Sequence, residues 1–299
     1  MNETPAHTAG TVRILGHEVD VTRATPDVVR FFESYFEAKS GDDVDALMAH
    51  FSRESVTYGD ATVGWVFRDW KVLYDQFADL LDSWPEAAVA YPTRIIGDFT
   101  SAVVFFVDSP EMFGREVRAV GTVDFQGGRA VRWVDHWDGR SLTVAGVEKL
   151  RVPVDRFPAD FGEQAVGETA APALLPAVQK LAAALTAGDA AQVASLFDTD
   201  VILEDTALHT LVTGQLAVQS FLSRTLPELP YGQGVSVRHV VGGALGGAFE
   251  WSSRSAVPLG TTALELGHNG LITRVTSTWD GSLWREEAIT EAQLATLPG

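Results

Sequence analysis

Three aspartates stand within stretches of the sequence that are otherwise apolar and typical of β-strands. Asp60 ends the run "SVTYGD", Asp108 ends "AVVFFVD", and Asp135 interrupts "AVRWVDHWD". Burial makes a carboxyl group hold its proton more tightly, and two neighbouring carboxylates resist ionising together. Such groups can donate and accept protons near neutral pH, as general acid–base catalysis requires. These residues therefore predict proton-transfer chemistry that needs neither a cofactor nor a metal.

The alternation of side chains along a strand indicates which residues accompany these aspartates. Asp135 shares a strand face with Trp133 and Trp137, and Asp108 shares one with Phe106. Two carboxylates are therefore expected in a cavity with aromatic walls. We predict that the substrate-binding wall is made of the aromatic residues Phe31, Trp65, Phe106, Trp133 and Trp137.

The elements that position these residues follow from the spacing of apolar side chains. Helical spacing predicts helices over residues 26–39, 44–51 and about 70–81. A short strand precedes the third helix, and alternating runs bounded by Gly, Asp and Pro predict strands over residues 91–98, 101–108, 115–125 and 129–137. Three helices followed by a curved, mostly antiparallel sheet predict a cone-shaped α+β barrel domain.

A repeat indicates that the chain contains this domain twice. The segments "HWDGRSL" (136–142) and "TWDGSLW" (278–284) each end a strand-like run, and "GDDVDALMAHF" and "GDAAQVASLF" precede them in the same order. We predict a leader with a hairpin (1–25), a first cone domain (26–142), a linker (143–172), a second cone domain (173–290) and a tail (291–299). The two domains are expected to form an internal pseudo-dimer, and the whole chain is expected to be a monomer or to dimerise further.

Composition narrows the class of protein. The chain has 299 residues, 46% of them hydrophobic, and a formal net charge of −18, which disfavours nucleic acid and anionic membranes as partners. No apolar run approaches the roughly 20 residues that span a bilayer. Cysteine is absent, the seven histidines show no metal-binding spacing, and no phosphate-binding loop occurs. The expected protein is cytoplasmic and binds an apolar small molecule.

The order helix, Gly-Asp, helix, and strand ending in Asp resembles the nuclear transport factor 2-like superfamily. That superfamily includes ketosteroid isomerases, SnoaL-type polyketide cyclases, scytalone dehydratases and limonene-epoxide hydrolases. The resemblance covers residues 26–140 and 173–285. It implies a conical fold with a deep apolar pocket, on which many activities occur.

Within the superfamily, "TYGDA", "FFVDS" and "WVDHWD" most resemble the limonene-epoxide hydrolase branch. This resemblance implies that Asp135 is the base, that Asp108 protonates an epoxide oxygen, and that Tyr58 and Asp60 hold the nucleophilic oxygen. It implies epoxide opening, by water or an internal hydroxyl, in polyketide- or terpenoid-type metabolism.

One residue departs from that pattern, because Phe106 stands where the hydrolases have an arginine and cannot donate a hydrogen bond. Arg94, Arg115 or Arg118 on a neighbouring strand is a candidate for the missing cation.

Other functions stay open. Tyr35 and Asp60 resemble the tyrosine and aspartate base of ketosteroid isomerases, although no carboxyl stands near Gly121, where those enzymes have their second acid. SnoaL-type cyclisation would use similar groups. A protein of another class, which only binds a hydrophobic ligand or scaffolds a partner, would have purely structural aspartates.

The second domain is expected to be degenerate. Asp205 matches Asp60, but Ser277 replaces Asp135 and Leu203 replaces Tyr58. About Ser252 replaces Asp108, whereas Glu250 is a candidate for an inward carboxylate of its own. We expect this copy to supply the partner surface of a dimer.

Overall fold

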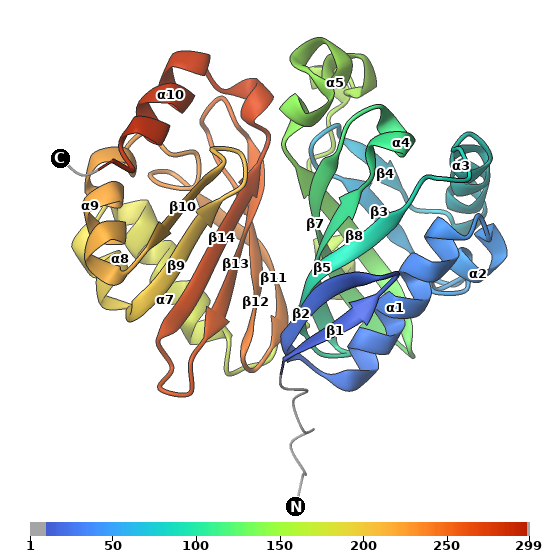
Figure 1. Ribbon diagram of the computed structural model, residues 1–299, viewed down its shortest axis with the longest axis horizontal. Helices are drawn as coiled ribbons and strands as arrows, with labels where there is room; N and C mark the ends of the chain where they lie inside the picture. The colour runs from blue at the N-terminus through green and yellow to red at the C-terminus, as the bar shows by residue number, and fades with distance from the viewer. Residues whose placement is uncertain (1–9, 298–299) are drawn as a thin grey trace, which may run out of the picture.

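The computed structural model describes residues 10–297, which form two α+β units whose sheets face each other (Figure 1). The elements of the first unit are β1 (Thr11–Ile14), β2 (His17–Ala24), α1 (Pro26–Ser40), α2 (Val44–Met48), β3 (Thr57–Asp60), β4 (Trp65–Phe67), α3 (Trp70–Asp82), β5 (Ala90–Gly97), β6 (Ser101–Asp108), α4 (Pro110–Phe113), β7 (Val117–Gln126) and β8 (Arg129–Trp137).

A layer of short helices connects the units, and the second unit repeats the first. The connection holds η1 (Gly139–Leu142), α5 (Val144–Leu150), η2 (Val154–Arg156) and α6 (Glu163–Val166). The second unit holds α7 (Leu175–Ala187), α8 (Ala190–Ser195), β9 (Phe197–Asp205), β10 (Thr210–Thr213), α9 (Gln215–Thr225), β11 (Ser236–Gly243), β12 (Gly246–Ser252), β13 (Leu259–Leu266), β14 (Ile272–Trp279), η3 (Gly281–Leu283) and α10 (Glu286–Leu294).

Both sheets are mixed and open. Their strand orders are β1-β2-β5-β6-β7-β8-β3-β4 and β10-β9-β14-β13-β12-β11. The predicted tandem α+β architecture is confirmed, but the predicted barrel is not. Closure would require the two edge strands of a sheet to pair, and no such pairing occurs within residues 10–297. The units are curved open sheets with helices on one face.

The leader contributes to the first sheet. Of its predicted residues 1–25, residues 1–9 lie outside the described part of the chain, as do residues 298–299 of the predicted tail. β1 and β2 form a hairpin that turns at Gly16, whose φ of 81° suits glycine. β2 then runs parallel to β5, which widens the first sheet beyond the second.

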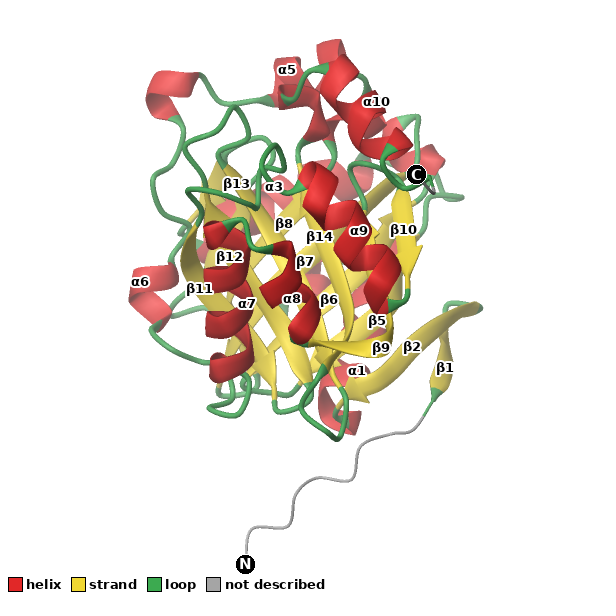
Figure 2. Cartoon of the chain, turned by 90° about the vertical axis from the view of Figure 1, so that its left-hand side faces the viewer, coloured by secondary structure: helices red, strands yellow, loops and turns green. Residues whose placement is uncertain are grey.

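In each unit the helices pack on the face of the sheet that points away from the other unit, where their apolar stripes are buried. α1 begins at Pro26, which is well suited to a first helical position, and buries Phe32 and Phe36 against the concave face of its sheet. Asp69 caps the N-terminus of α3, and its carboxylate accepts hydrogen bonds from the backbone N–H groups of Lys71 and Val72. Figure 2 shows α7, α8 and α9 covering the outer face of the second sheet in the same way. No helix in the described part of the chain has the length and apolar character needed to cross a membrane.

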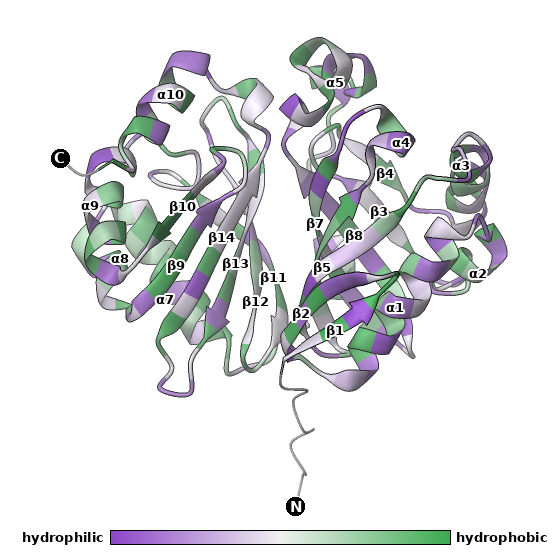
Figure 3. Cartoon of the chain, viewed as in Figure 1, coloured by the Kyte–Doolittle hydropathy of each residue, from purple (hydrophilic) through white to green (hydrophobic). Residues whose placement is uncertain are grey.

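The opposite faces of the two sheets meet at a shared junction. A hydrophobic cluster there takes side chains from both units, among them Val103, Phe105 and Val120 from the first and Val241 and Ala248 from the second. Figure 3 shows hydrophobic residues along the strands on both sides of this junction. The predicted internal pseudo-dimer is therefore confirmed.

The two W-D-G segments interlock at one end of the junction. Asp280 accepts a hydrogen bond from the Gly139 N–H, and Asp138 accepts one from the Gly281 N–H, each at 3.1 Å. A Cβ on Gly139 would lie 2.6 Å from an Asp280 carboxylate oxygen, so the close approach requires glycine. Each copy thus caps the strand-ending turn of the other.

Charged side chains are also buried at the junction, which corrects an expectation about Glu250. Glu250 accepts a hydrogen bond from Arg132 at 2.6 Å, across the junction. The sheet registers place Trp251, not Glu250, at the position of Phe106. Ala119 pairs with Phe106 on one side and Trp137 on the other, and Gly260 pairs in the same way with Trp251 and Trp279. Glu250 faces the first unit rather than the interior of its own.

Candidate active site

A cavity of about 240 Å³ opens between the concave face of the first sheet, α3 and the connecting layer. Most of its wall is aromatic or aliphatic. Its polar side chains are Lys39, Tyr58, Asp60, Gln76, Asp108 and Asp135. An apolar pocket with a few converging polar groups is the usual form of a small-molecule site.

Asp135 is the most tightly held carboxyl group in this cavity. Tyr58 Oη donates to Oδ2 at 2.5 Å, and Trp133 Nε1 donates to Oδ1 at 2.6 Å. Burial, with a contribution from the nearby charge of Asp60, raises the pKa of Asp135 to about 7, although the two hydrogen bonds and the charge of Lys39 act to lower it. Near neutral pH, Asp135 can therefore exchange a proton at little cost.

Asp60 lies beside Asp135, because the two residues pair across the parallel strands β3 and β8. Trp137 Nε1 donates to its Oδ2 at 2.8 Å, and the backbone N–H groups of Thr62 and Val63 donate to Oδ1 at 2.9 and 3.1 Å. Burial raises the pKa of Asp60 to about 6 despite these bonds. The cavity thus contains two adjacent carboxyl groups that titrate close to neutrality.

Asp108 is paired with a cation from α1. Lys39 Nζ lies 2.7 Å from Asp108 Oδ1, and both side chains are about nine-tenths buried. The same nitrogen lies 5.0 Å from the centre of the Phe106 ring and 5.8 Å from that of Trp84. Contact of a cation with ring faces adds to its stabilisation in an apolar site.

The cation beside Asp108 is Lys39 on α1, and not an arginine on a neighbouring strand as predicted. Arg94 instead crosses the junction to Glu265 at 3.1 Å, Arg118 pairs with Glu116 on the surface, and Arg115 is exposed. Lys39 was missed although the sequence holds a signal for it. It stands three residues after Phe36, on the buried stripe of a helix that is otherwise apolar there.

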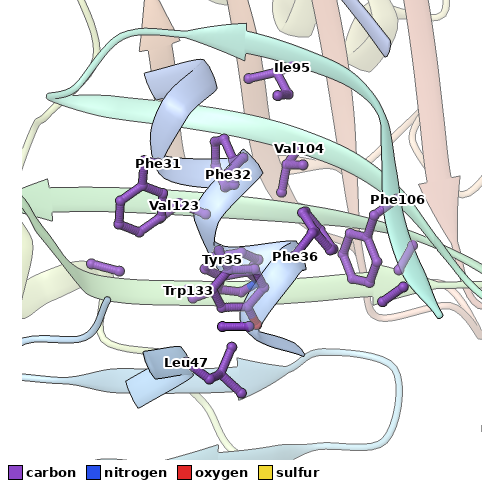
Figure 4. Close-up of a cluster of buried hydrophobic side chains, with 14 of the residues drawn as sticks. Phe31, Phe32, Tyr35, Phe36, Leu47, Ile95, Val104, Phe106, Val123 and Trp133 are labelled. Atoms are coloured by element: carbon purple, nitrogen blue, oxygen red, sulfur yellow. The ribbon is translucent and has the colours of Figure 1, made fainter. Parts of the chain in front are cut away.

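Seven of the ten predicted site residues line this one cavity: Tyr58, Asp60, Trp65, Phe106, Asp108, Asp135 and Trp137. The other three lie in the core behind it (Figure 4). Tyr35 stacks on Trp133 with ring centres 4.5 Å apart, and Phe31 packs against Phe125 farther along α1. They lie there because the buried stripe of α1 packs their rings into the hydrophobic core of the first unit. Trp133 reaches the site only through its bond to Asp135.

No group of three or more His, Asp or Glu side chains within residues 10–297 is arranged to hold a metal ion. The polar groups of the cavity are instead occupied with one another, as the Tyr58–Asp135, Trp137–Asp60 and Lys39–Asp108 contacts show. The cavity thus brings together three carboxyl groups, a phenol and an ammonium group.

The same region of the second unit is packed differently. Asp205 accepts a hydrogen bond from Trp279 at 3.0 Å, as Asp60 does from Trp137. Ser277 pairs with Asp205 in the register that Asp135 has with Asp60, and it bonds Thr262 at 3.0 Å. The fully buried Trp251 takes the place of Phe106. The carboxyl pair of the first unit is thus reduced to one aspartate.

No protein-family model and no curated protein matches this sequence. Solved structures do match. One is an NTF-2 like protein of unknown function from Burkholderia xenovorans (15% identity, TM-score 0.33, covering 37% of this chain and 82% of that one). Another is a putative polyketide cyclase from Sinorhizobium meliloti (22% identity, TM-score 0.31, covering 36% of this chain and 93% of that one). A third is a putative ketosteroid isomerase from Kribbella flavida (18% identity, TM-score 0.32, covering 45% of this chain and 93% of that one). Each of these three matches spans less than half of this chain.

Proposed function

We propose that the first unit is a cofactor-free enzyme that transfers protons on a small apolar molecule, with Asp135 as the proton carrier. The observation that carries this proposal is the setting of the Asp135 carboxyl group. It faces an apolar cavity, is oriented by two hydrogen-bond donors, and has a pKa raised to about 7. Perturbed carboxyl groups of this kind are typical of general acids and bases.

The other polar groups have complementary roles. Tyr58 keeps Asp135 oriented, and Asp60 is a second carboxyl group that can take up or return the proton. Lys39 already gives one hydrogen to Asp108, and an ammonium group has three. Its remaining hydrogens can stabilise negative charge on a substrate oxygen.

Two reactions fit these roles. In epoxide opening, one group protonates the departing oxygen while a carboxylate activates water. In isomerisation or aldol-type cyclisation, Asp135 removes a proton from a carbon next to a carbonyl, and the resulting enolate oxygen carries the charge. The Lys39–Asp108 pair favours the second reaction, because an ion-paired carboxylate is a poor proton donor and a buried cation suits an enolate.

The size of the cavity supports a small substrate. Its volume of about 240 Å³ lies below the roughly 300 Å³ at which pockets for drug-sized ligands begin. We therefore favour molecules of monoterpenoid or single-ring size over four-ring polyketides and steroids.

The test is a product analysis with enolisable cyclic ketones and monoterpene epoxides, comparing the wild type with Asp135→Asn. We expect conversion of at least one ketone, and a loss of about 10²–10⁴-fold in rate in the variant. Ser277→Ala, the matched change in the second copy, should keep full activity. Conversion of epoxides alone would favour epoxide opening. Binding without conversion of either class, or full activity in Asp135→Asn, would contradict the proposal.

A further inference from the structure

The carboxylate of Asp280, in the second copy, bonds two residues of the connecting layer that lie next to the lining of the first copy's cavity. It accepts the Gly139 N–H at 3.1 Å and a guanidinium N–H of Arg151 at 2.5 Å. The Asp280 side chain is 5% exposed. Gly139 and Arg151 both belong to segments that border the candidate active site, so this carboxylate connects the second copy to two parts of it.

The first connection runs through Arg151 to the cover of the cavity. Leu150 lines the cavity, and its carbonyl oxygen accepts the Trp65 indole N–H at 2.9 Å. The Val152 N–H donates to the carbonyl oxygen of Val63 at 2.8 Å. The Arg151–Asp280 ion pair therefore holds the segment 150–152 between the cavity and the loop that follows Asp60.

That loop holds Asp60 directly. The N–H of Val63 donates to the Asp60 carboxylate at 3.1 Å. Thr62 Oγ1 donates to the carbonyl oxygen of Trp137 at 2.8 Å and accepts the Trp137 N–H at 3.1 Å. Any shift of segment 150–152 is thus passed to the loop and to the Asp60 carboxyl group.

The second connection runs through Gly139 to the end of β8. Gly139 follows Trp137 by two residues, and the indole of Trp137 is a hydrogen-bond donor to Asp60. By fixing the Gly139 N–H, Asp280 fixes the turn that ends this strand. The two connections converge on one carboxyl group of the cavity.

We infer that Asp280 is a positioning residue for the first copy's active site, holding the Asp60 loop and the cover of the cavity through Arg151 and Gly139. The degenerate copy then contributes to the site of the intact one. Asp138 provides the matching contact in the other direction, to Gly281.

A consequence of this placement is electrostatic as well as geometric. The groups that face Asp60 are Asp135 and Tyr58 from the first unit and, more distantly, Asp280 with its partner Arg151. The negative charge of Asp280 raises the pKa of Asp60, whose main cause of elevation is burial. Removing that charge lowers the pKa of Asp60, whereas loosening the loop weakens the Thr62 and Val63 hydrogen bonds that hold this pKa down and so raises it.

The test uses two indole groups as reporters and needs no substrate, so its outcome is independent of the turnover experiment above. In ¹⁵N-labelled protein, the Trp137 indole resonance follows the titration of Asp60, and that of Trp133 follows Asp135. In Asp280→Asn we expect amide exchange at Val63 to accelerate about tenfold, because its bond to Asp60 loosens, together with a change in the Trp137 midpoint that is larger than the change at Trp133. An unchanged exchange rate at Val63 would overturn the inference.

Glu265→Gln is the matched control, because it breaks another ion pair between the copies, with Arg94, away from the loop. It should leave the Val63 exchange rate and the Trp137 midpoint in place, and an equal acceleration at Val63 in this variant would also overturn the inference. Arg151→Gln provides a second route if Asp280→Asn does not fold. In it, amide exchange at Val152 should accelerate about tenfold, and an unchanged rate would contradict the role of the Arg151–Asp280 pair.

Discussion

The two copies differ in the residues that face the interior and agree in those that build the turn. Lys39 corresponds to Leu185. The Asp43 N–H donates to the carbonyl oxygen of Ala38 just as the Asp189 N–H donates to that of Ala184, and Lys39 and Leu185 are the next residues after those two alanines. Strand register shows three further positions that differ: Tyr58 corresponds to Leu203, Asp108 to Ser253 and Asp135 to Ser277. Other residues are the same in both copies. The hydrogen-bonded pair Asp60–Trp137 recurs as Asp205–Trp279, and Asp138 recurs as Asp280.

This comparison separates architecture from chemistry. The aspartate–tryptophan bond occurs in both copies, so it is needed to hold the strand ends of the fold. Lys39, Tyr58, Asp108 and Asp135 are confined to the copy with the cavity, where a buried charge would otherwise be a burden on stability. The four following predictions test that separation, beginning with the largest expected effect.

Replacing Lys39 with the leucine of the second copy should lower the free energy of unfolding by about 3–5 kcal/mol, because it leaves Asp108 buried without its partner. The double variant Lys39→Leu/Asp108→Ser, which copies both positions of the second unit, should recover most of that loss. Urea denaturation of the two variants measures this difference. A single variant as stable as the wild type would show that the pair is not a buried ion pair in solution.

Asp135→Asn should stabilise the protein at pH 8 by about 2 kcal/mol, and less at lower pH. The pKa of Asp135 is raised from 3.8 to about 7 on folding, so the folded state binds its proton more tightly. Wild-type stability from this group is full below about pH 4 and is lost as the pH rises through 7. Urea denaturation from pH 4 to pH 8 should show the two curves diverging, whereas Ser277→Ala should run parallel to the wild type. Parallel curves for Asp135→Asn would contradict the raised pKa.

Gly121→Ala should cost about 1–3 kcal/mol of stability through overpacking. Its Cβ would lie 2.8 Å from Trp133 Nε1 and 3.1 Å from Asp135 Oδ1, so the indole and the carboxylate must separate. Thermal unfolding measures the loss, and a shifted Trp133 indole resonance reports the separation. At the corresponding position of the second copy, Thr262→Ala introduces no clash, removes a methyl group and a hydroxyl that bonds Ser277 and Trp251, and should cost about 1 kcal/mol. Equal effects at both positions would remove the distinction between the copies here.

Tyr58→Phe should have the smallest effect, a rise of about 0.5–1 unit in the pKa of Asp135. The Tyr58 hydrogen bond favours the ionised carboxylate, and phenylalanine cannot make it. The Trp133 indole resonance measures the midpoint. Tyr74→Phe is the control, since its hydroxyl bonds Asp45 on the surface. A lower midpoint in Tyr58→Phe would mean that the hydroxyl does not support the carboxylate.

Local patterns in the sequence were sufficient for the elements. The helix predicted over residues 70–81 is α3, Trp70–Asp82, and the strand predicted over residues 101–108 is β6. Apolar spacing succeeds in such cases because each element buries a single face. Whether a sheet closes depends on its two edge strands, which lie far apart in sequence, and so the open form of the sheets was not predictable from these patterns.

The cavity was predictable in part for a similar reason. Strand alternation was enough to place Asp135 and Asp108 on inward faces, whereas the pairing of Asp60 with Asp135 depends on the register of β3 and β8, which alternation does not give. The partner of Asp108 comes from a helix, 69 residues earlier, and no strand pattern points to it. Neighbouring side chains of a strand face opposite ways. An error of one residue in aligning β12 with β6 was therefore enough to predict that Glu250 faces the interior of its own unit.

The exchanged caps at Gly139 and Gly281 bear on how the chain folds. Neither strand-ending turn is complete until the other copy is in place, because each lends its aspartate to the partner's backbone. The last steps of folding in the two halves are therefore coupled, and a chain cut between them would leave both turns frayed. We therefore expect the two copies to unfold together, although they no longer carry the same side chains.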